Sequence, residues 1–374
     1  MEEYDVEQND GSLTKLTLSN SMCVGIDFDR LGRAIATNTK IIELDVSLQG
    51  ITLNVTDKEF YNGLKQNSSI HEVVIRDGFI MMEHGVGSEI LRAYQENNNH
   101  IKRLSILNAV LANRGDEIIT ATLQCCTNLT TINLYSCNIT ADKLLAMVEV
   151  MRGINSLEKL LLNSNRIGDA GCEALATLLE DPNSNVEQLQ LFDNRIFNKG
   201  AIAIANSLTN NTKLKQLYFG RNPFDQIVED VFVKILCNTA SINETYSSNH
   251  KVEHISLPYE ESGQLKSLLT LNKEGMNESR VAIRKILLHH PNIDMKPFFK
   301  LDGGEEDNLK ALPYIVDWFS KADLAVTDNE ERQRCSIDGR KLSAIYQFAL
   351  AMPLQLIPAS HTKVDDKKRK RYNA

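Results

Sequence analysis

The stretch LEKLLLNSNRIGDAGCEALATLLEDPNSN, residues 157–185, decides the fold. Leu157, Leu160 and Leu162 have the spacing of a short strand with one buried face. Asn165 follows at the bend, where a side-chain amide can bond the backbone groups that the end of the strand leaves open. The next segment, GDAGCEALATLLE, carries its leucines at helical spacing and predicts a helix. The whole stretch therefore predicts one strand–bend–helix unit.

The apolar phrase Leu-x-x-Leu-x-Leu recurs about every 28 residues along the 374-residue chain. A period of this length predicts a solenoid, in which each unit buries its core against its neighbours. The nine phrases start at Leu13, Ile41, Ile70, Ile101, Leu129, Leu157, Val186, Leu214 and, with a weaker pattern, Ile242. An apolar residue also stands ten positions after each of these starts, so we expect one register throughout.

The repeat resembles the ribonuclease-inhibitor-like class of leucine-rich repeats, whose pattern is L-x-x-L-x-L-x-x-(N/C)-x-(I/L). Cys137 occupies the bend position at which that class alternates Asn with Cys. The resemblance implies an α/β horseshoe with parallel strands on the concave face and helices on the convex face. The first four repeats depart from the pattern and are expected to be less regular. Their bend positions hold Ser21, Gln49, Gly78 and Ala109.

The pattern divides the chain into four expected segments. They are an acidic lead-in (1–12), the repeat solenoid (13–259), an all-α C-terminal cap (260–356) and a basic tail expected to be disordered (357–374). Terminal repeats of a solenoid need such caps. A second alternation, Val252, Ile255 and Leu257, could close the sheet in place of the phrase at Ile242. The helices expected in the cap span about 262–272, 278–290, 308–322 and 338–351.

A second resemblance concerns the C-terminal cap. The strings SRVAIRKILLHHPNIDMKPFF (279–299), LKALPYIVDWFSKAD (309–323) and RKLSAIYQFALAMP (340–353) resemble the C-terminal segment of an expanded, largely uncharacterised family of leucine-rich-repeat proteins in diatoms. The resemblance covers nearly the whole chain and implies nothing specific about function.

Composition limits the function classes. A formal net charge of -8 argues against general affinity for nucleic acid, and no apolar run is long enough to span a membrane. The seven cysteines are scattered, without zinc-ligand or redox spacing, so we expect reduced thiols, no metal and no cofactor. The N-terminus lacks the pattern of a secretory signal, so we expect an intracellular, cytoplasmic protein.

Residues one, two, four, six and seven positions after the first Leu of each phrase are expected on the concave face, because strand residues alternate sides. Aromatic residues there are typical anchors of protein interfaces, and the charges beside them are mixed rather than basic. We therefore expect a protein or peptide partner and no nucleic acid. The candidate partner-binding residues are Tyr135, Phe192, Tyr218, Tyr246, Arg103, Lys159, Asp193 and Arg221.

These features favour a non-enzymatic interaction scaffold or receptor-type binding module, which we expect to be a monomer. No phosphate loop, nucleophile elbow or zinc motif occurs in the sequence. The alternative is a GTPase-activating protein resembling the Ran GTPase activators, for which Arg76 and Arg114 are the candidate catalytic positions. Ribonuclease inhibition would rest on the repeat class alone, and fold does not imply function. A nuclear-import run is a further hypothesis for Lys367, Lys368, Arg369, Lys370 and Arg371.

Overall fold

The computed structural model describes residues 6, 9, 11–19, 25–77, 80–81, 85–95, 100–111, 114–273 and 278–290. The chain divides into two compact units, Met1–Glu278 and Ser279–Ala374. The first unit contains all the strands that the structure describes, and the described part of the second unit consists of most of one helix.

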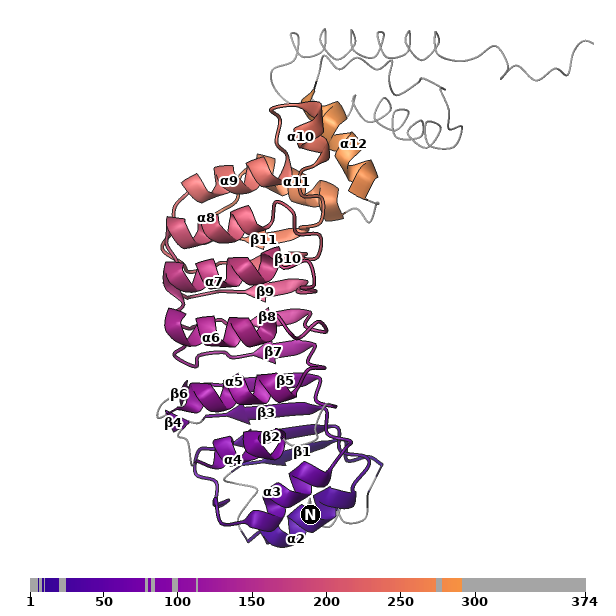
Figure 1. The fold of residues 1–374 in the computed structure, drawn as a ribbon, viewed down its shortest axis with the longest axis vertical. Coiled ribbons are helices and arrows are strands. Elements are labelled where there is room, and N and C mark those ends of the chain that lie inside the picture. The colour runs from indigo at the N-terminus through magenta and orange to yellow at the C-terminus, as the bar shows by residue number, and fades with distance from the viewer. Residues whose placement is uncertain are drawn as a thin grey trace, which may run out of the picture. The chain divides into compact units, whose positions relative to one another are not determined.

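A parallel sheet of nine strands runs through the first unit, with helices packed along one side of it (Figure 1). Each strand is hydrogen-bonded to the strand of the next repeat, so the phrases stack in register. The strands, in their order across the sheet, are β1 (Lys15–Leu18), β2 (Glu43–Ser47), β3 (Glu72–Arg76), β5 (Arg103–Leu107), β7 (Thr131–Asn133), β8 (Lys159–Leu161), β9 (Gln188–Gln190), β10 (Gln216–Tyr218) and β11 (His254–Ser256).

The helices that cover the sheet follow the strands one for one through most of the unit. A short second sheet joins β4 (Ile80–Met81) to β6 (Val110–Leu111). Among the described residues the helices, in chain order, are α2 (Phe28–Thr37), α3 (Lys58–Gln66), α4 (Val86–Ala93), α5 (Gly115–Cys125), α6 (Ala141–Met151), α7 (Gly168–Glu180), α8 (Asn198–Ser207), α9 (Ile227–Leu236), α10 (Ile242–Tyr246), α11 (Gly263–Lys273) and α12 (Glu278–His289), of which α12 belongs almost wholly to the second unit. The predicted solenoid of parallel strands and alternating helices is thus confirmed; its horseshoe curvature stays a prediction.

The apolar positions of the phrase form the core between the two layers. Leu157, Leu160 and Leu162 are buried, as are the matching residues of the neighbouring repeats. Burying one such side chain contributes about 1.5–3 kcal/mol, and the gain recurs in every repeat. The residues between them point away from the helices and are exposed, as Lys159 is, or half-buried, as Leu161 is. The register therefore fixes which side chains a partner can reach.

The bends after β3, β5, β7, β8, β9 and β10 use a left-handed backbone conformation at the eighth position of the phrase. The N–H of each of these residues except Arg221 donates to a carbonyl of the next repeat, for example Ser164 to Phe192 at 2.8 Å. This bonding holds a conformation that non-glycine residues rarely adopt. The residues are Asp77, Asn108, Ser136, Ser164, Asp193 and Arg221, with φ between 55° and 60°.

The expected ninth repeat at Ile242 is wrong. Residues Ile242–Tyr246 form helix α10, in which Ile242 is exposed and Thr245 is buried. The ninth strand is β11, which pairs with β10 and belongs to the alternative phrase at Val252. Val252 therefore starts the last phrase and does not stand ten positions after a phrase start, so the single register ends at the eighth repeat.

Helices α11 and α12 lie where the first two helices of the C-terminal cap were predicted. Helix α11 packs against α9 and β11 within the first unit. The other two predicted helices and the basic tail fall outside the described residues, so the division of the chain into 260–356 and 357–374 stays a prediction.

Candidate partner-binding surface

We call the side of the nine-stranded sheet that points away from the helices the strand face. It carries the third and fifth residues of each phrase, and the seventh and eighth residues adjoin it at the bend. In the later repeats the third-position row is Lys159, Gln188, Gln216 and His254. The fifth-position row beside it is Leu161, Gln190, Tyr218 and Ser256.

On the first four strands the strand face is a layer of ion pairs. Asp45, which is nearly buried, accepts from Arg76 Nε at 2.8 Å and from Lys15 Nζ at 3.0 Å. Arg103 Nε lies 2.9 Å from Glu72 on the adjacent strand. These charges already have partners, and a ligand would have to displace them at a desolvation cost. The predicted binding residue Arg103 is thus exposed but engaged, and it lies three strands from β9.

The centre of the predicted aromatic cluster is Phe192, at the bend after β9. The Arg221 guanidinium carbon lies 5.1 Å from the centroid of its ring, a cation–π contact. Gly220 makes room for the ring, because a Cβ there would lie 2.8 Å and 2.9 Å from two ring carbons. The Phe192 N–H donates to Asn163 Oδ1 at 2.9 Å, which fixes the backbone below the ring. Ring and guanidinium form one ordered unit.

Tyr218 extends this unit along the neighbouring strand, β10. Its ring centroid lies 4.9 Å from that of His254, and its hydroxyl donates to Gln216 Oε1 at 3.2 Å. Gln190, the register partner of Tyr218 on β9, accepts a hydrogen bond from Asn163 Nδ2 at 2.6 Å. The result is a surface of aromatic rings and side-chain amides. His254 was not among the predicted residues because the weak phrase at Ile242 displaced the register.

The remaining predicted residues lie at different distances from this cluster. Lys159 is exposed in the third-position row beside Gln188, and Asp193 is exposed at the bend next to Phe192. Tyr135 is 41% exposed, but Asn163 stands between it and Phe192 in the seventh-position row. The prediction that Tyr246 lies on the strand face is wrong: it is 52% exposed on helix α10 and does not lie on a strand.

We call Phe192, Tyr218, Gly220, Arg221 and His254 the aromatic patch.

Buried asparagines at the bends hold the repeats together as predicted. Asn165 Oδ1 accepts from the backbone N–H groups of Cys137 and Ile139, each at 3.0 Å, and its amide nitrogen donates to Leu134 O at 2.8 Å. Asn222 repeats this pattern two repeats later, bonding the N–H groups of Asn194 and Ile196. These residues belong to the scaffold.

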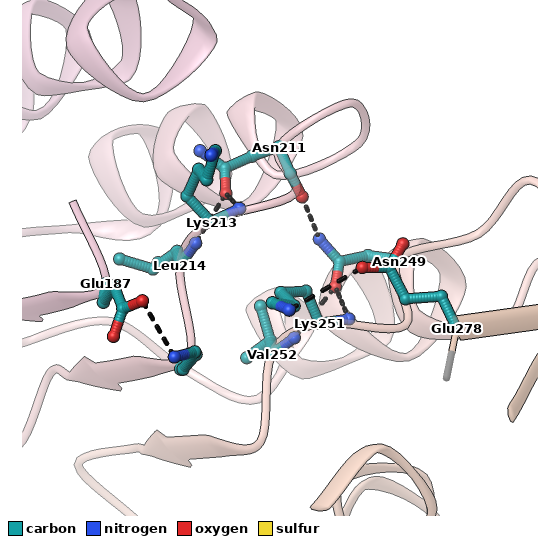
Figure 2. Close-up of polar contacts among 9 residues, drawn as sticks. Glu187, Asn211, Lys213, Leu214, Asn249, Lys251, Val252 and Glu278 are labelled. Atoms are coloured by element: carbon teal, nitrogen blue, oxygen red, sulfur yellow. Dashed lines mark hydrogen bonds and ion pairs between the residues drawn. The ribbon is translucent and has the colours of Figure 1, made fainter. Parts of the chain in front are cut away.

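A second series of asparagines, three positions before the phrase, was missed. Asn211 Oδ1 accepts from the N–H groups of Lys213 and Leu214, and its Nδ2 donates to Leu179 O at 2.7 Å. Asn249 does the same one repeat later and also donates to Asn211 O at 2.9 Å, so the two repeats are linked (Figure 2). Asn38 and Asn67 form the equivalent pair at the other end of the sheet. The recurrence of Asn before the phrase was the available signal.

The two arginines nominated for GTPase activation do not converge. Arg76 ends β3 and is bonded to Asp45 on the strand face. Arg114 precedes α5 on the helix side, and its Nη2 lies 2.6 Å from Glu117. A catalytic arginine must reach the phosphates of a bound nucleotide, and both guanidinium groups are held by carboxylates of this chain.

Other chemistry receives no support within the described residues. They contain no group of three or more His, Cys, Asp or Glu side chains that could hold a metal ion. Burial raises the pKa of the Cys126 and Cys137 thiols to about 12, which suppresses their reactive thiolate form. In the part of the chain that the structure describes, no helix is long and apolar enough to cross a membrane.

Comparison with known proteins agrees with this architecture. A family model described as "Leucine Rich repeat" matches residues 153–176 and 183–205. The chain is 24% identical over 268 residues to NACHT, LRR and PYD domains-containing protein 14 of Mus musculus, a match that covers 71% of this chain and 26% of that protein. It is 26% identical to NACHT, LRR and PYD domains-containing protein 3 of Bos taurus, over 47% of this chain and 17% of that protein.

The ribonuclease inhibitor of Mus musculus is a third relative, at 28% identity over 36% of this chain and 28% of the inhibitor. The chain therefore spans less than a third of the length of each of these relatives. Among solved structures, leiomodin-1 actin-binding site 2 is matched at a TM-score of 0.31 and 18% identity, over 41% of this chain and 86% of that one. An overlap this low supports no conclusion.

Proposed function

Because this chain is a leucine-rich-repeat protein with repeats of the ribonuclease-inhibitor-like class, we propose that it is a non-enzymatic interaction protein that binds another polypeptide on its strand face. The similarity to other leucine-rich-repeat proteins supports the general part of this proposal, that the chain is an interaction scaffold. The finer proposal is that the contact is centred on β9, β10 and β11, where the aromatic patch lies.

The observation that carries this proposal is the contrast between the two ends of the strand face. On β1 to β5 the long charged side chains are paired with one another. On β9 to β11 the rings and amides form no ion pair, and the pair nearest to them, Lys215 with Glu187 at 2.8 Å, lies just before the strands β10 and β9. Interfaces are centred on aromatic and arginine side chains surrounded by hydrogen-bonding groups. This composition suits a polypeptide, whereas a nucleic acid would require a row of unpaired basic residues.

Two further expectations belong to this proposal. Four of the five free cysteines among the described residues are buried, which fits a reducing, intracellular compartment. The nuclear-import run at 367–371 lies outside the described residues, and it stays a prediction together with the monomeric state.

The proposal is tested by changing the surface without touching the core. Partners copurified with the full chain would be compared with those of the double variant Phe192→Ala and Tyr218→Ala. We expect the partners to be lost from this variant. The matched control is Tyr135→Ala, which removes an exposed ring outside the aromatic patch and should leave them bound. If the double variant folds and retains every partner, the surface assignment is wrong.

The GTPase-activator alternative has less support, because Arg76 and Arg114 are both held in ion pairs and lie on different sides of the sheet. A GTP-hydrolysis assay with a small GTPase tests it directly. Stimulation that is lost in Arg76→Ala or Arg114→Ala would favour the alternative over the scaffold.

A further inference from the structure

We propose that Arg221 is a carboxylate anchor, and that the polypeptide bound on the strand face places an Asp or Glu side chain on it. This inference rests on the proposed function and names the chemistry of the partner. It starts from the environment of one guanidinium group, which differs from that of the arginines on the first four strands.

Arg221 is exposed, and among the described residues its guanidinium forms no ion pair. Arg76 and Arg103, on the same face, are bonded to Asp45 and Glu72. Asp193 stands at the same bend position one repeat earlier, yet the two side chains do not pair. An arginine left unpaired at the centre of an accessible surface is available to a partner.

The group is also held in place before any partner arrives. The Arg221 guanidinium lies over the Phe192 ring, and Gly220 lets that ring lie against the backbone. A cation–π contact uses none of the guanidinium N–H groups as a hydrogen-bond donor to oxygen, so they can donate to two carboxylate oxygens. A fixed donor loses less conformational entropy on binding than a mobile Lys or Arg side chain.

The surface around Arg221 suits the rest of an extended segment. Strands β9 and β11 flank β10, so the rows continue on both sides of the anchor. Within the described structure the Gln188 side chain has no hydrogen-bond partner, and Gln216 uses its oxygen to accept from Tyr218. Side-chain amides can both donate to and accept from a peptide backbone. We therefore assign the side chain of an internal acidic residue, and not a chain terminus, to the anchor.

The test uses peptides selected on the protein itself. A phage-displayed library of random linear peptides is panned on the full chain, and the enriched sequence is synthesised with a blocked C-terminus. Its dissociation constant is then measured by calorimetry, along with those of versions in which each Asp or Glu is replaced by Asn or Gln. We expect one acid-to-amide change to weaken binding about tenfold or more, as for a charged hydrogen bond.

Two variants of the protein complete a double-mutant cycle. In Arg221→Gln the peptide should bind about tenfold or more weakly, and the acid-to-amide change should then cost little. The matched control is Arg103→Gln, which removes a strand-face arginine already paired with Glu72 and should leave the affinity unchanged. Far-UV circular dichroism and thermal unfolding of each variant check that it folds.

The outcomes separate this inference from the proposed function. Peptides that lose affinity in Tyr218→Ala but tolerate both Arg221→Gln and the loss of their acids overturn the anchor and leave the strand face as the binding site. Peptides unaffected by Tyr218→Ala and by Phe192→Ala overturn both. Enrichment that is the same on Arg221→Gln as on the unchanged protein also overturns the anchor.

Discussion

Gly220 matters at the residue scale because the ring of Phe192 occupies the space where a Cβ would be. Replacing Gly220 with Ala would put that carbon 2.8 Å from the ring, so the ring must move away from Arg221. We expect Gly220→Ala to cost less than about 1 kcal/mol of stability, because the half-buried ring can turn away, and to weaken partner binding because the ring leaves its place against Arg221. Urea unfolding and titration with the selected peptide measure the two effects.

The control for this change is Gly263→Ala at the start of α11, where a Cβ would meet nothing within 4 Å. It should bind like the unchanged protein and unfold at the same or a slightly higher urea concentration, since Ala favours the helix more than Gly does. Wild-type affinity in a folded Gly220→Ala variant would show that the position of the ring does not matter for binding.

The side chain of Asn211 forms hydrogen bonds with backbone groups of its own loop and of the preceding repeat. It accepts two N–H groups, donates to Leu179 O, and is 8% exposed. Asn211→Ala leaves these buried groups without partners, and each unsatisfied group costs about 1–3 kcal/mol. We expect a loss of at least about 2 kcal/mol in the free energy of unfolding, measured by chemical denaturation.

Asn185→Ala is the comparison for this prediction. Asn185 also bonds the preceding repeat, donating to Asn155 O at 2.7 Å, but this bond is exposed, so water replaces it. A cost below about 0.5 kcal/mol is expected, as for ordinary surface substitutions. Equal losses in the two variants would contradict the view that burial makes the Asn211 bonds valuable.

At the scale of elements, α2 and α3 are packed unusually closely through two glycines. A Cβ on Gly63 would overlap the carbonyl of Gly32, and a Cβ on Gly32 would overlap the backbone of Glu59 and Phe60. No rearrangement of a side chain relieves an overlap with backbone, so the helices would have to separate. We expect Gly63→Ala to destabilise the first repeats by more than about 2 kcal/mol, despite the better helix propensity of Ala.

Amide hydrogen exchange can locate this effect. Faster exchange in Gly63→Ala should be confined to α2, α3 and the strands beside them, because a repeat contacts only its neighbours. Gly11→Ala, where a Cβ meets nothing within 4 Å, should change neither exchange nor stability. Protection that falls equally in α7 and α8 would argue that the sheet unfolds as one unit.

Most elements could be predicted because the same apolar spacing returns in each repeat. Leu217 is recognisable as a core residue from Leu160 and Leu189, with which it aligns in the sheet. The prediction of a repeat at Ile242 is wrong for a local reason. Ser241 Oγ accepts the N–H of Glu244 at 3.1 Å, so the Ser-x-x-Glu sequence starts a helix. This capping signal was present in the sequence and outweighs the weak apolar phrase.

The aromatic patch could be predicted only in part. Phe192, Tyr218 and Arg221 follow from their positions in the phrase. The contact between Arg221 and Phe192, and the space that Gly220 provides for it, depend on side-chain conformations that spacing does not determine. The phrase does not predict ion pairs either. Arg103 and Arg221 are both expected on the same face, and only the structure shows that Arg103 has a carboxylate partner, Glu72.

Each repeat of the solenoid contacts only its neighbours, so a whole repeat can be removed without unfolding the rest. Deletion of entire repeats tests this property together with the binding surface. Removing residues 157–185 brings Val186 to the position of Leu157, so β9 would pair with β7. Asn194 would then replace Asn165 in bonding the N–H groups of Cys137 and Ile139. Because stability is approximately a sum over repeats and their interfaces, we expect a folded protein of lower stability that still binds the selected peptide.

Removing residues 186–213 instead is the matched deletion, since it also takes out one whole repeat but eliminates Phe192 and Gln190. Leu214 then follows the repeat at Leu157, and Asn222 takes the place of Asn194. Circular dichroism should show two folded proteins, of which the second unfolds more easily because it also loses Asn211 and its bonds. Only the second should fail to bind the peptide in calorimetry. Binding by both proteins would place the contact elsewhere on the solenoid, and loss from both would mean that it needs the length of the sheet rather than the residues around Arg221.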